Sequence, residues 1–408
     1  MENKSSDKME DEAVPKITVV ELEEGRPRAA RLKSRLDRLG SVFQRSLHRR
    51  NKSEESPWPK LVRRTLYLFT TTLGLAVIGF VIYHAVLLAF IRRVRPLPLP
   101  TNGLTKIVHS WVEPGSVIPA PPSWLPDFSR DVQPKAIHSH NDYWRRVPLF
   151  DALSLGITGV EADCHLVDGE LFVGHTPNSL RKNRTFRSLY LDPLTSILTN
   201  QNAANGIANS TTINGVWDVN STQGIVLMTD LKTEGFSTLD AVQAQLEPLR
   251  LKGWLTYWSG TGIVPGPITH VATGNTPFAA VLNSSYSNAT YRSVFFDAPL
   301  DNLSSEYDAS NSYYASVSIN RVVGGPHKIA QSGLSKTQLA TIKTQIDRAS
   351  SLRLTSRYWD LPAWPENQRT TVWKQLEQLG IGMLNVDAID EAARFNWRWC
   401  TIMGLHLC

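Results

Sequence analysis

One apolar segment constrains this chain more than any other feature. Residues 66–91, LYLFTTTLGLAVIGFVIYHAVLLAFI, form a run of 26 residues in which His84 is the only side chain that titrates near neutral pH. A helix of roughly 20 apolar residues crosses the hydrocarbon core of a bilayer. The run is too long, and begins too far from the N-terminus, to be a cleaved signal peptide. It therefore predicts a single transmembrane helix rather than the core helix of a soluble domain.

Basic residues flank this run unequally. Residues 26–64 contain 13 Lys and Arg against 3 Asp and Glu, whereas the other flank has only Arg92, Arg93 and Arg95 before the sequence PLPLP. Since cytoplasmic flanks carry the excess of Lys and Arg, we expect a cytoplasmic N-terminus and a luminal or extracellular C-terminal domain. The tail, residues 1–65, is expected to be partly disordered. Its segment 31–50 fits either a basic amphipathic helix on an anionic membrane or a solvated tail.

The C-terminal part carries features that suit a domain outside the cytosol. Six Asn-x-Ser/Thr sequons favour a glycoprotein. They are Asn183, Asn209, Asn220, Asn283, Asn288 and Asn302. The chain has only three cysteines, Cys164, Cys400 and Cys408, which are too few for a disulfide-built scaffold. Whether Cys400 and Cys408 pair is left open by the sequence.

The charge distribution argues against a nucleic-acid partner. The chain has a net charge of +6, but residues 96–408 contain 24 Lys and Arg against 26 Asp and Glu. The excess of positive charge therefore lies in the tail and beside the apolar run. Phosphate-backbone binding needs clustered Lys and Arg, which the large C-terminal part does not offer by composition.

After a linker predicted over residues 92–130, short apolar runs alternate with helical patterns. The predicted strands are 135–139, 158–164, 170–175, 224–231, 267–273, 293–299, 314–319, 353–360 and 380–387. The predicted helices are 150–156, 189–200, 239–253, 336–349 and 366–380. This alternation predicts an α/β fold, namely a (β/α)8 TIM barrel over residues 131–400, with a doubly wound sheet as the alternative. No Gly-x-Gly-x-x-Gly, Walker A or Gly-x-Ser-x-Gly motif is present.

Four polar motifs stand at the ends of predicted strands. They are AIHSHNDYW with His138, His140 and Asn141; VEADC with Glu161 and Asp163; LFVGH with His175; and LMTDLK with Asp230 and Lys232. Carboxylates among apolar strand residues are costly unless they are paired or bind a metal. Because side chains two residues apart on a strand lie on the same face, Glu161 and Asp163 should share one face of their strand, and Asp230 and Lys232 one face of theirs.

These motifs suit metal-assisted chemistry on a phosphodiester. Glu161, Asp163 and Asp230 form an all-oxygen ligand set that suits Mg²⁺ or Ca²⁺. Lys232 would bind a phosphate oxygen, and two histidines would serve as general base and general acid. By itself, however, His-x-His is also typical of a zinc ligand pair.

The stretch HSHNDYWRRVPLFDALSLGITGVEADCHLVDGELFVGH, followed by VLMTDLKT, resembles the phospholipase C-like phosphodiesterase superfamily. That superfamily includes the glycerophosphodiester phosphodiesterases and the sphingomyelinase D-like enzymes, all of them TIM barrels. Within it, HSHNDYWR and the late RYWDLPAWP and LNVD segments are most similar to the fungal altered inheritance of mitochondria protein 6 family. The resemblance extends in order from residue 131 to about residue 395.

The resemblance implies roles for single residues. It places Glu161, Asp163 and Asp230 on a divalent metal, His175 as one acid/base and Lys232 on the substrate phosphate. Either His138 or His140 would be the other acid/base; His140 is preferred because its 21-residue spacing to Glu161 suits the shorter family members. Asn141 stands where glycerophosphodiesterases have a phosphate-binding arginine, so it would contact substrate only weakly.

The sequence thus predicts a membrane-anchored, metal-dependent phosphodiesterase that acts on a phospholipid or on its head-group diester. One alternative is a His-x-His metallohydrolase of the amidohydrolase or PHP type, which would need further histidine ligands such as His270 or His327. The other is a non-catalytic, membrane-anchored barrel. Arg357, Trp359 and Asp387 lie near late strand ends, where they either line the pocket or pack.

Overall fold

The computed structural model describes residues 60–94, 101–203, 213–394, 401–402 and 405–406. The chain divides into two compact units, Met1–Pro96 and Leu97–Cys408. The predicted tail up to residue 59, the sequon at Asn209, and both Cys400 and Cys408 lie outside the described residues.

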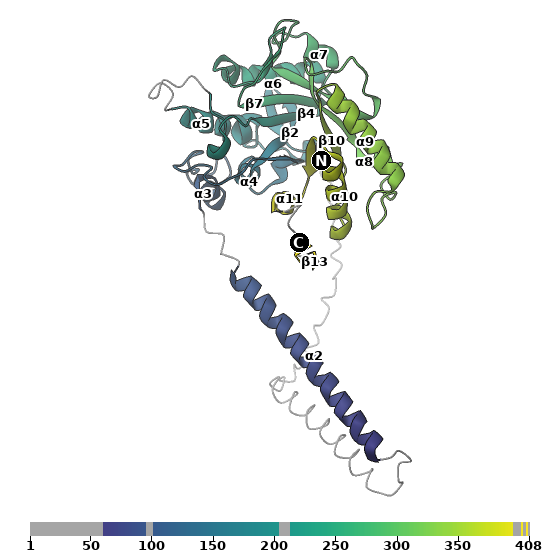
Figure 1. The fold of residues 1–408 in the computed structure, drawn as a ribbon. Helices are drawn as coiled ribbons and strands as arrows, with labels where there is room; N and C mark the ends of the chain where they lie inside the picture. The colour runs from purple at the N-terminus through teal and green to yellow at the C-terminus, as the bar shows by residue number, and fades with distance from the viewer. Residues whose placement is uncertain (1–59, 95–100, 204–212, 395–400, 403–404, 407–408) are drawn as a thin grey trace, which may run out of the picture. The chain divides into compact units, whose positions relative to one another are not determined.

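The first unit contributes one long helix, α2 (Lys60–Val94), which confirms the helix predicted over residues 66–91 (Figure 1). Among the described residues it is the one helix long and apolar enough to cross a membrane, and its side chains from Lys60 to Leu88 are exposed. Its threonine hydroxyls donate to carbonyls one turn earlier, as Thr71 does to Tyr67 at 2.6 Å. Such bonds satisfy the hydroxyl without water, which an apolar environment requires.

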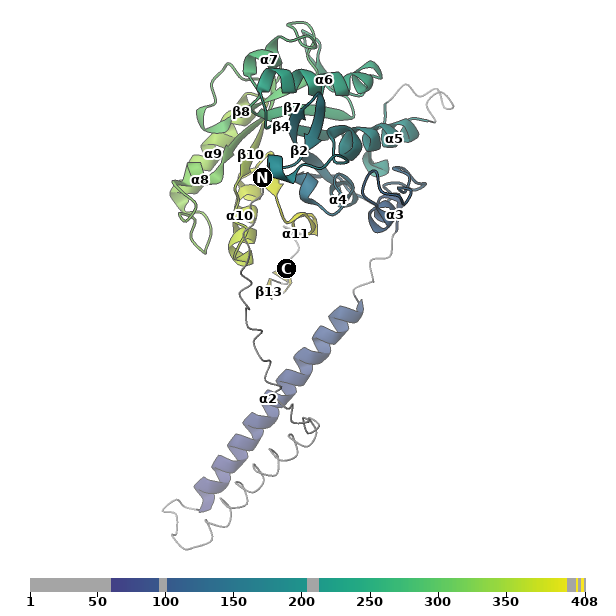
Figure 2. The ribbon, with the colours of Figure 1, turned by 180° about the vertical axis from the view of Figure 1, so that it is seen from behind.

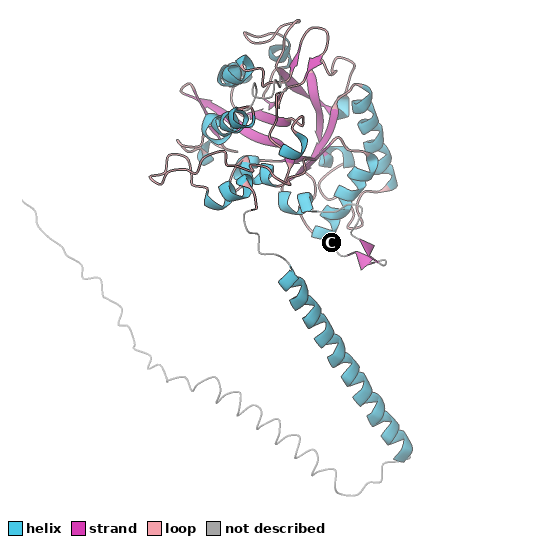
Figure 3. Cartoon of the chain, turned by 60° about the vertical axis from the view of Figure 1, so that its left-hand side comes forward, coloured by secondary structure: helices cyan, strands magenta, loops and turns pink. Residues whose placement is uncertain are grey.

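The second unit is a closed barrel of eight parallel strands (Figure 3). In barrel order the strands are β1 (Lys135–Ser139), β2 (Ile157–Val167), β4 (Ile225–Leu231), β7 (Ile268–Gly274), β8 (Val294–Pro299), β9 (Ser312–Ser318), β10 (Thr355–Trp359) and β11 (Met383–Val386). Because β1 pairs in parallel with both β2 and β11, the sheet has no edge there and closes on itself. The predicted (β/α)8 barrel is confirmed, and the doubly wound alternative is wrong.

Helices cover the outside of the barrel (Figures 1 and 2). They are α4 (Phe150–Ser154), α5 (Asp192–Gln201), α6 (Gly235–Leu251), α7 (Phe278–Leu282), α8 (Ile319–Val323), α9 (Lys336–Ser351), α10 (Glu366–Leu379) and α11 (Ile389–Arg394). The five predicted helices are all present. The helices α7, α8 and α11 were not predicted, because five or six residues are too few to show a helical period.

The barrel interior is divided along the strand direction. A small apolar cluster inside it comprises Val226, Met228, Val271, Tyr314 and Met383. Further along the strands, the inward-facing side chains are polar or charged and belong to the site described below. The chemistry therefore lies towards the carboxyl ends of the strands, where TIM-barrel sites lie.

The predicted linker is shorter than composition suggests. Within residues 92–130 the structure has α3 (Gly103–Ser110), which begins with a capping box between Asn102 and Thr105. Leu104 and Ile107 of this helix are buried in the main core. The packed unit thus begins well before residue 131, because the short helix α3 within this Pro-rich stretch packs against α4.

Short strands complete the structure. β3 (Glu170–Val173) pairs antiparallel with β2. The pairs β5 (Tyr257–Trp258) with β6 (Ile263–Val264), and β12 (Thr401–Ile402) with β13 (Leu405–His406), form two separate two-stranded sheets. Of these, only the β2–β3 hairpin positions a residue of the candidate site.

Candidate active site

Three carboxylates meet inside the barrel. Glu161 and Asp163 alternate with the outward-facing Ala162 and Cys164 on β2, and the register sets Asp163 beside Asp230 on β4. One oxygen from each of Glu161, Asp163 and Asp230 lies within 4.8 Å of the others. Alternation along two adjacent parallel strands is therefore enough to bring this predicted set together.

Lys232 lies directly against this cluster. Its Nζ is 2.9 Å from Asp163 Oδ2 and donates to Asp230 Oδ2 at 2.6 Å. Its backbone N–H donates to the Cys164 carbonyl, which holds the residue beside β2. Burial opposes the charged amine, but the two carboxylates outweigh it and raise the pKa of Lys232. Burial, with Glu161 and Asp230 nearby, raises the pKa of Asp163 to about 6.

The β2–β3 hairpin brings His175 to the same carboxylates. After β3, the Gly174 N–H donates to the Asp163 carbonyl, so the next residue stands at the level of Asp163. His175 Nδ1 lies 3.2 Å from Asp163 Oδ2. The imidazole is half-exposed, and its ring centroid is 5.1 Å from that of Trp144. His175 is thus both anchored and open to a substrate.

Glu161 is held deeper in the barrel by a histidine and an arginine. His138 Nε2 lies 3.4 Å from Glu161 Oε2, and Arg357 Nη1 lies 3.7 Å from the same oxygen. Burial alone would favour protonated Glu161, yet these neighbours lower its pKa to about 2. Burial lowers the pKa of His138 to about 4, and its side chain has no exposed surface. His138 is therefore neutral near pH 7 and shielded from solvent.

His140 lies above His138, just past the end of β1. Its Nδ1 is 2.9 Å from Asp387 Oδ1, and its backbone N–H donates to the Val386 carbonyl. Burial opposes the charged imidazole, but the hydrogen bond to Asp387 and the charge of Glu161 prevail and raise the pKa of His140. Its side chain is 22% exposed, so of the two histidines in the HSH motif it is the one that a substrate can reach.

A tyrosine links the two ends of the site. The Tyr143 hydroxyl lies 2.7 Å from both Asn141 Oδ1 and Asp163 Oδ2, and 3.2 Å from His175 Nδ1. Asn141 adopts a left-handed conformation with φ of 50°, which asparagine tolerates better than most residues. The Asn141 side chain contacts Tyr143 through its amide oxygen, and its Nδ2 lies 3.5 Å from His140 Nδ1.

The carboxylate cluster fits a hard divalent cation. Asp163 Oδ1 is buried without a hydrogen-bond partner among the described residues, and Glu161 Oε2 has only the longer contacts to His138 and Arg357. Buried carboxylate oxygens without a partner carry a large desolvation cost, which a cation would offset. Among those residues, no histidine belongs to a potential metal cluster, and His270 is buried with its Nε2 2.9 Å from Thr229 Oγ1. The geometry thus favours oxygen ligation over His-x-His ligation.

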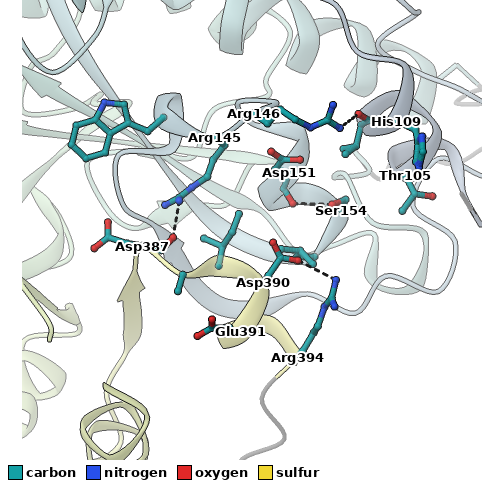
Figure 4. A pocket seen from close by; sticks show the side chains of 15 residues that line it. Thr105, His109, Arg145, Arg146, Asp151, Ser154, Asp387, Asp390, Glu391 and Arg394 are labelled. Carbon is teal, nitrogen blue, oxygen red and sulfur yellow. Dashed lines mark hydrogen bonds and ion pairs between the residues drawn. The ribbon is translucent and has the colours of Figure 1, made fainter. Parts of the chain in front are cut away.

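A separate cavity near this site has a volume of about 700 Å³ (Figure 4). Its lining includes Trp144, Arg145 and Asp387, but none of the three carboxylates, Lys232 or His175. Arg145 extends toward Asp387 and donates to its carbonyl oxygen as well as to that of His140. Arg145, which lines this cavity, therefore holds the segment after β1 that carries His140.

The sequence missed Tyr143 as a site residue and left the roles of Arg357 and Asp387 open. Arg357 is buried and donates to Ser316, Asn385 and Asp297, so it is a partner of the site and not an exposed pocket residue. Asp387 could have been predicted as a site residue, because it is a carboxylate directly after β11, the strand that closes the barrel against β1.

Comparisons with known proteins point to a family of phosphodiesterase-like domains. Residues 126–297 match the model of the AIM6-like phosphodiesterase domain. An altered inheritance of mitochondria protein 6 homolog from Arthroderma benhamiae is 36% identical over 65% of this chain and 85% of its own. The protein of that name from Lachancea thermotolerans is 34% identical over 64% of this chain and 65% of its own, and that from Saccharomyces cerevisiae 32% over 66% and 73%.

Among solved structures, a phosphatidylinositol-specific phospholipase C from Listeria monocytogenes is similar with a TM-score of 0.34 and 13% identity, over 65% of this chain and 92% of that one. The assignment of the barrel rests on the strand pairing described above.

Proposed function

The chain belongs to the altered inheritance of mitochondria protein 6 family, and from that membership we propose that it is a metal-dependent phosphoric diester hydrolase anchored in a membrane by α2. The proposed substrate is a phospholipid or its head-group phosphodiester. The single observation that carries the proposal is the meeting of three carboxylates, Lys232 and two reachable histidines at the carboxyl-terminal end of one barrel.

In this proposal each side chain has a defined task. Glu161, Asp163 and Asp230 would hold Mg²⁺ or Ca²⁺, which supplies positive charge to a phosphoryl oxygen. Lys232 binds a second phosphoryl oxygen, because its ammonium group is fixed beside the carboxylates and still 23% exposed. Fixed positive charge of this kind stabilises the charge that develops on phosphorus oxygens during displacement.

The two histidines divide the proton transfers. His140 takes a proton from the water that attacks phosphorus, since Asp387 stabilises the imidazolium that this step creates. His175 gives a proton to the leaving oxygen, and Asp163 and Tyr143 hold its ring. His138 has no exposed surface, so its proposed task is to support Glu161 without touching substrate.

Activity and metal dependence are tested together on the full chain purified in detergent. We expect hydrolysis of bis(p-nitrophenyl) phosphate that EDTA abolishes, that Mg²⁺ or Ca²⁺ restores, and that Glu161→Ala removes. Turnover that survives either EDTA or Glu161→Ala would refute the metal mechanism. If bis(p-nitrophenyl) phosphate is not cleaved under any of these conditions, the alternative of a non-catalytic barrel gains support.

The two histidines of the HSH motif are told apart by their variants. His140→Ala is expected to lose turnover by a factor of about 10² to 10⁴, the usual range for a lost acid/base. Full activity in His140→Ala, combined with none in His138→Asn, would reverse this assignment.

The proposed topology places the N-terminus in the cytoplasm and the barrel in a lumen or outside the cell. Asn220, Asn283, Asn288 and Asn302 are exposed, whereas the Nδ2 of Asn183 donates to the Pro114 carbonyl. Glycosidase treatment of the protein from its native membrane is expected to increase its mobility, and replacing these four exposed asparagines by Gln should remove most of that shift. A protein with no glycosidase-sensitive mobility would contradict the topology.

A further inference from the structure

A second cavity, of about 480 Å³, lies beside His140. Loops that follow β9, β10 and β11 form its walls. Its lining includes His140 and Asp387 on one side, and Asp360, Leu361, Pro362 and Trp364 on the other. Since His140, a proposed acid/base, is part of this lining, a phosphodiester that contacts His140 would have a substituent next to the cavity.

The lining has a distinctive chemistry. The described residues that line the cavity include two aspartates and two histidines, His140 and His327, and no lysine or arginine. Trp364 is 75% exposed, so its indole ring is free to contact a ligand. The rest of the lining is Asn320, Gln368 and four apolar residues, Pro326, Ile329, Leu361 and Pro362. The cavity therefore offers an aromatic face and carboxylates to a cation.

The carboxylates are fixed in place. Asp360 directly follows β10 with φ of 58°, and its Oδ2 accepts a 2.7 Å hydrogen bond from Ser318 at the end of β9. Asp387 is held by His140. When His140 is protonated, its charge balances that of Asp387 and leaves the negative charge of Asp360 in the wall.

We propose that this cavity binds the alkylammonium group of a phosphodiester substrate, such as a choline or ethanolamine substituent. A cation over the face of a tryptophan is attracted by the ring quadrupole, and Trp is the best side chain for this contact. The inference rests on the proposed function for the position of the phosphate, and it narrows the substrate class from phosphodiesters in general to those with a cationic head group.

Binding is measured by isothermal titration on the full chain in an uncharged, choline-free detergent. The His175→Ala background slows turnover, and His175 does not line the cavity. We expect glycerophosphocholine or glycerophosphoethanolamine to bind tighter than glycerophosphoglycerol by about 2- to 30-fold, the range that one cation–π contact provides. Comparing choline with ethanolamine shows which ammonium group is preferred.

Variants identify the cavity as the source of this preference. Trp364→Ala should reduce it to less than about twofold, and Trp364→Phe should keep part of it, because phenylalanine still presents a ring. Trp359→Ala is the matched control, since Trp359 is 38% exposed at the end of β10 but does not line the cavity. Thermal unfolding of each variant verifies that this exposed position does not alter folding.

The outcomes separate the two proposals. If the three diesters bind equally, or if the preference survives Trp364→Ala and Asp360→Asn, the alkylammonium site is refuted while the hydrolase stands. If no diester binds and bis(p-nitrophenyl) phosphate is not cleaved either, the proposed function itself fails.

Discussion

Gly274 gives the sharpest test of the carboxylate cluster, although it bears no functional group. It is the last residue of β7 and pairs in register with Leu231. A Cβ built there would lie 2.0 Å from Asp230 Oδ1 and 2.8 Å from the Leu231 carbonyl oxygen. Gly274→Ala should therefore displace the Asp230 carboxylate while leaving its chemistry unchanged.

The size of the effect follows from two contributions. The φ of Gly274 is +68°, and a left-handed conformation costs a non-glycine residue about 1–2 kcal/mol. The clash adds a displacement of Asp230 on the order of 1 Å, because Cβ contacts shorter than 3.0 Å do not persist. A misplacement of that size lowers rates by about 10²-fold, and we expect the affinity for Mg²⁺ or Ca²⁺ to fall at least tenfold.

Gly380→Ala is the matched control. Gly380 has φ of +81° at the end of α10, and a Cβ there meets nothing within 4 Å. It shares the backbone cost without the clash, so both variants should lose a few degrees of thermal midpoint and only Gly274→Ala should lose metal. Metal titration of both proteins decides the matter. Metal affinity within twofold of wild type in folded Gly274→Ala, or an equal loss in Gly380→Ala, would refute the reasoning.

Three further predictions rest on single contacts. Asp387→Asn removes the group that raises the pKa of His140, so the limb of the pH–rate profile that reports His140 should move to lower pH and turnover should fall about 10- to 100-fold. Lys232→Met should reduce kcat/KM by about 10²- to 10³-fold, whereas Lys252→Met, whose ammonium lies over Trp254, should not. Burial lowers the pKa of His270 to about 3, so it disfavours the folded state as pH falls from about 6.5 toward 3. The difference between the pH–stability curves of wild type and His270→Gln should show this loss of stability, and parallel curves would contradict it.

The sequence predicted the barrel well because its strands are short apolar runs that end in polar residues. Each of the nine predicted strands has a counterpart, and eight of them close the barrel. The elements that escaped are those whose stability comes from packing. α3 lies in a Pro-rich stretch, and it is helical because a capping box begins it and Leu104 and Ile107 are buried.

The carboxylates were predictable for a physical reason. Two-residue spacing fixes Glu161 and Asp163 on one face of β2, and parallel register brings Asp230 alongside, so local pattern and topology give the same answer. Lys232 follows from the same spacing. Alternation along the strand cannot distinguish His138 from His140, because residues two apart point to the same face. Only the end of β1 after Ser139 separates the buried imidazole of His138 from the reachable imidazole of His140.

Contacts between residues far apart in the chain cannot be predicted from such a local pattern. Asp387 lies 247 residues from His140, and the two meet only because β11 pairs with β1 when the barrel closes. Arg357 reaches Glu161 across the barrel interior by the same closure. If these contacts set the protonation of His140 and the position of Glu161, the chemistry of the first two strands depends on the last two. A chain that lacks β10 and β11 would then keep all three carboxylates, Lys232 and all three histidines of the strand-end motifs, and still lose the proposed activity.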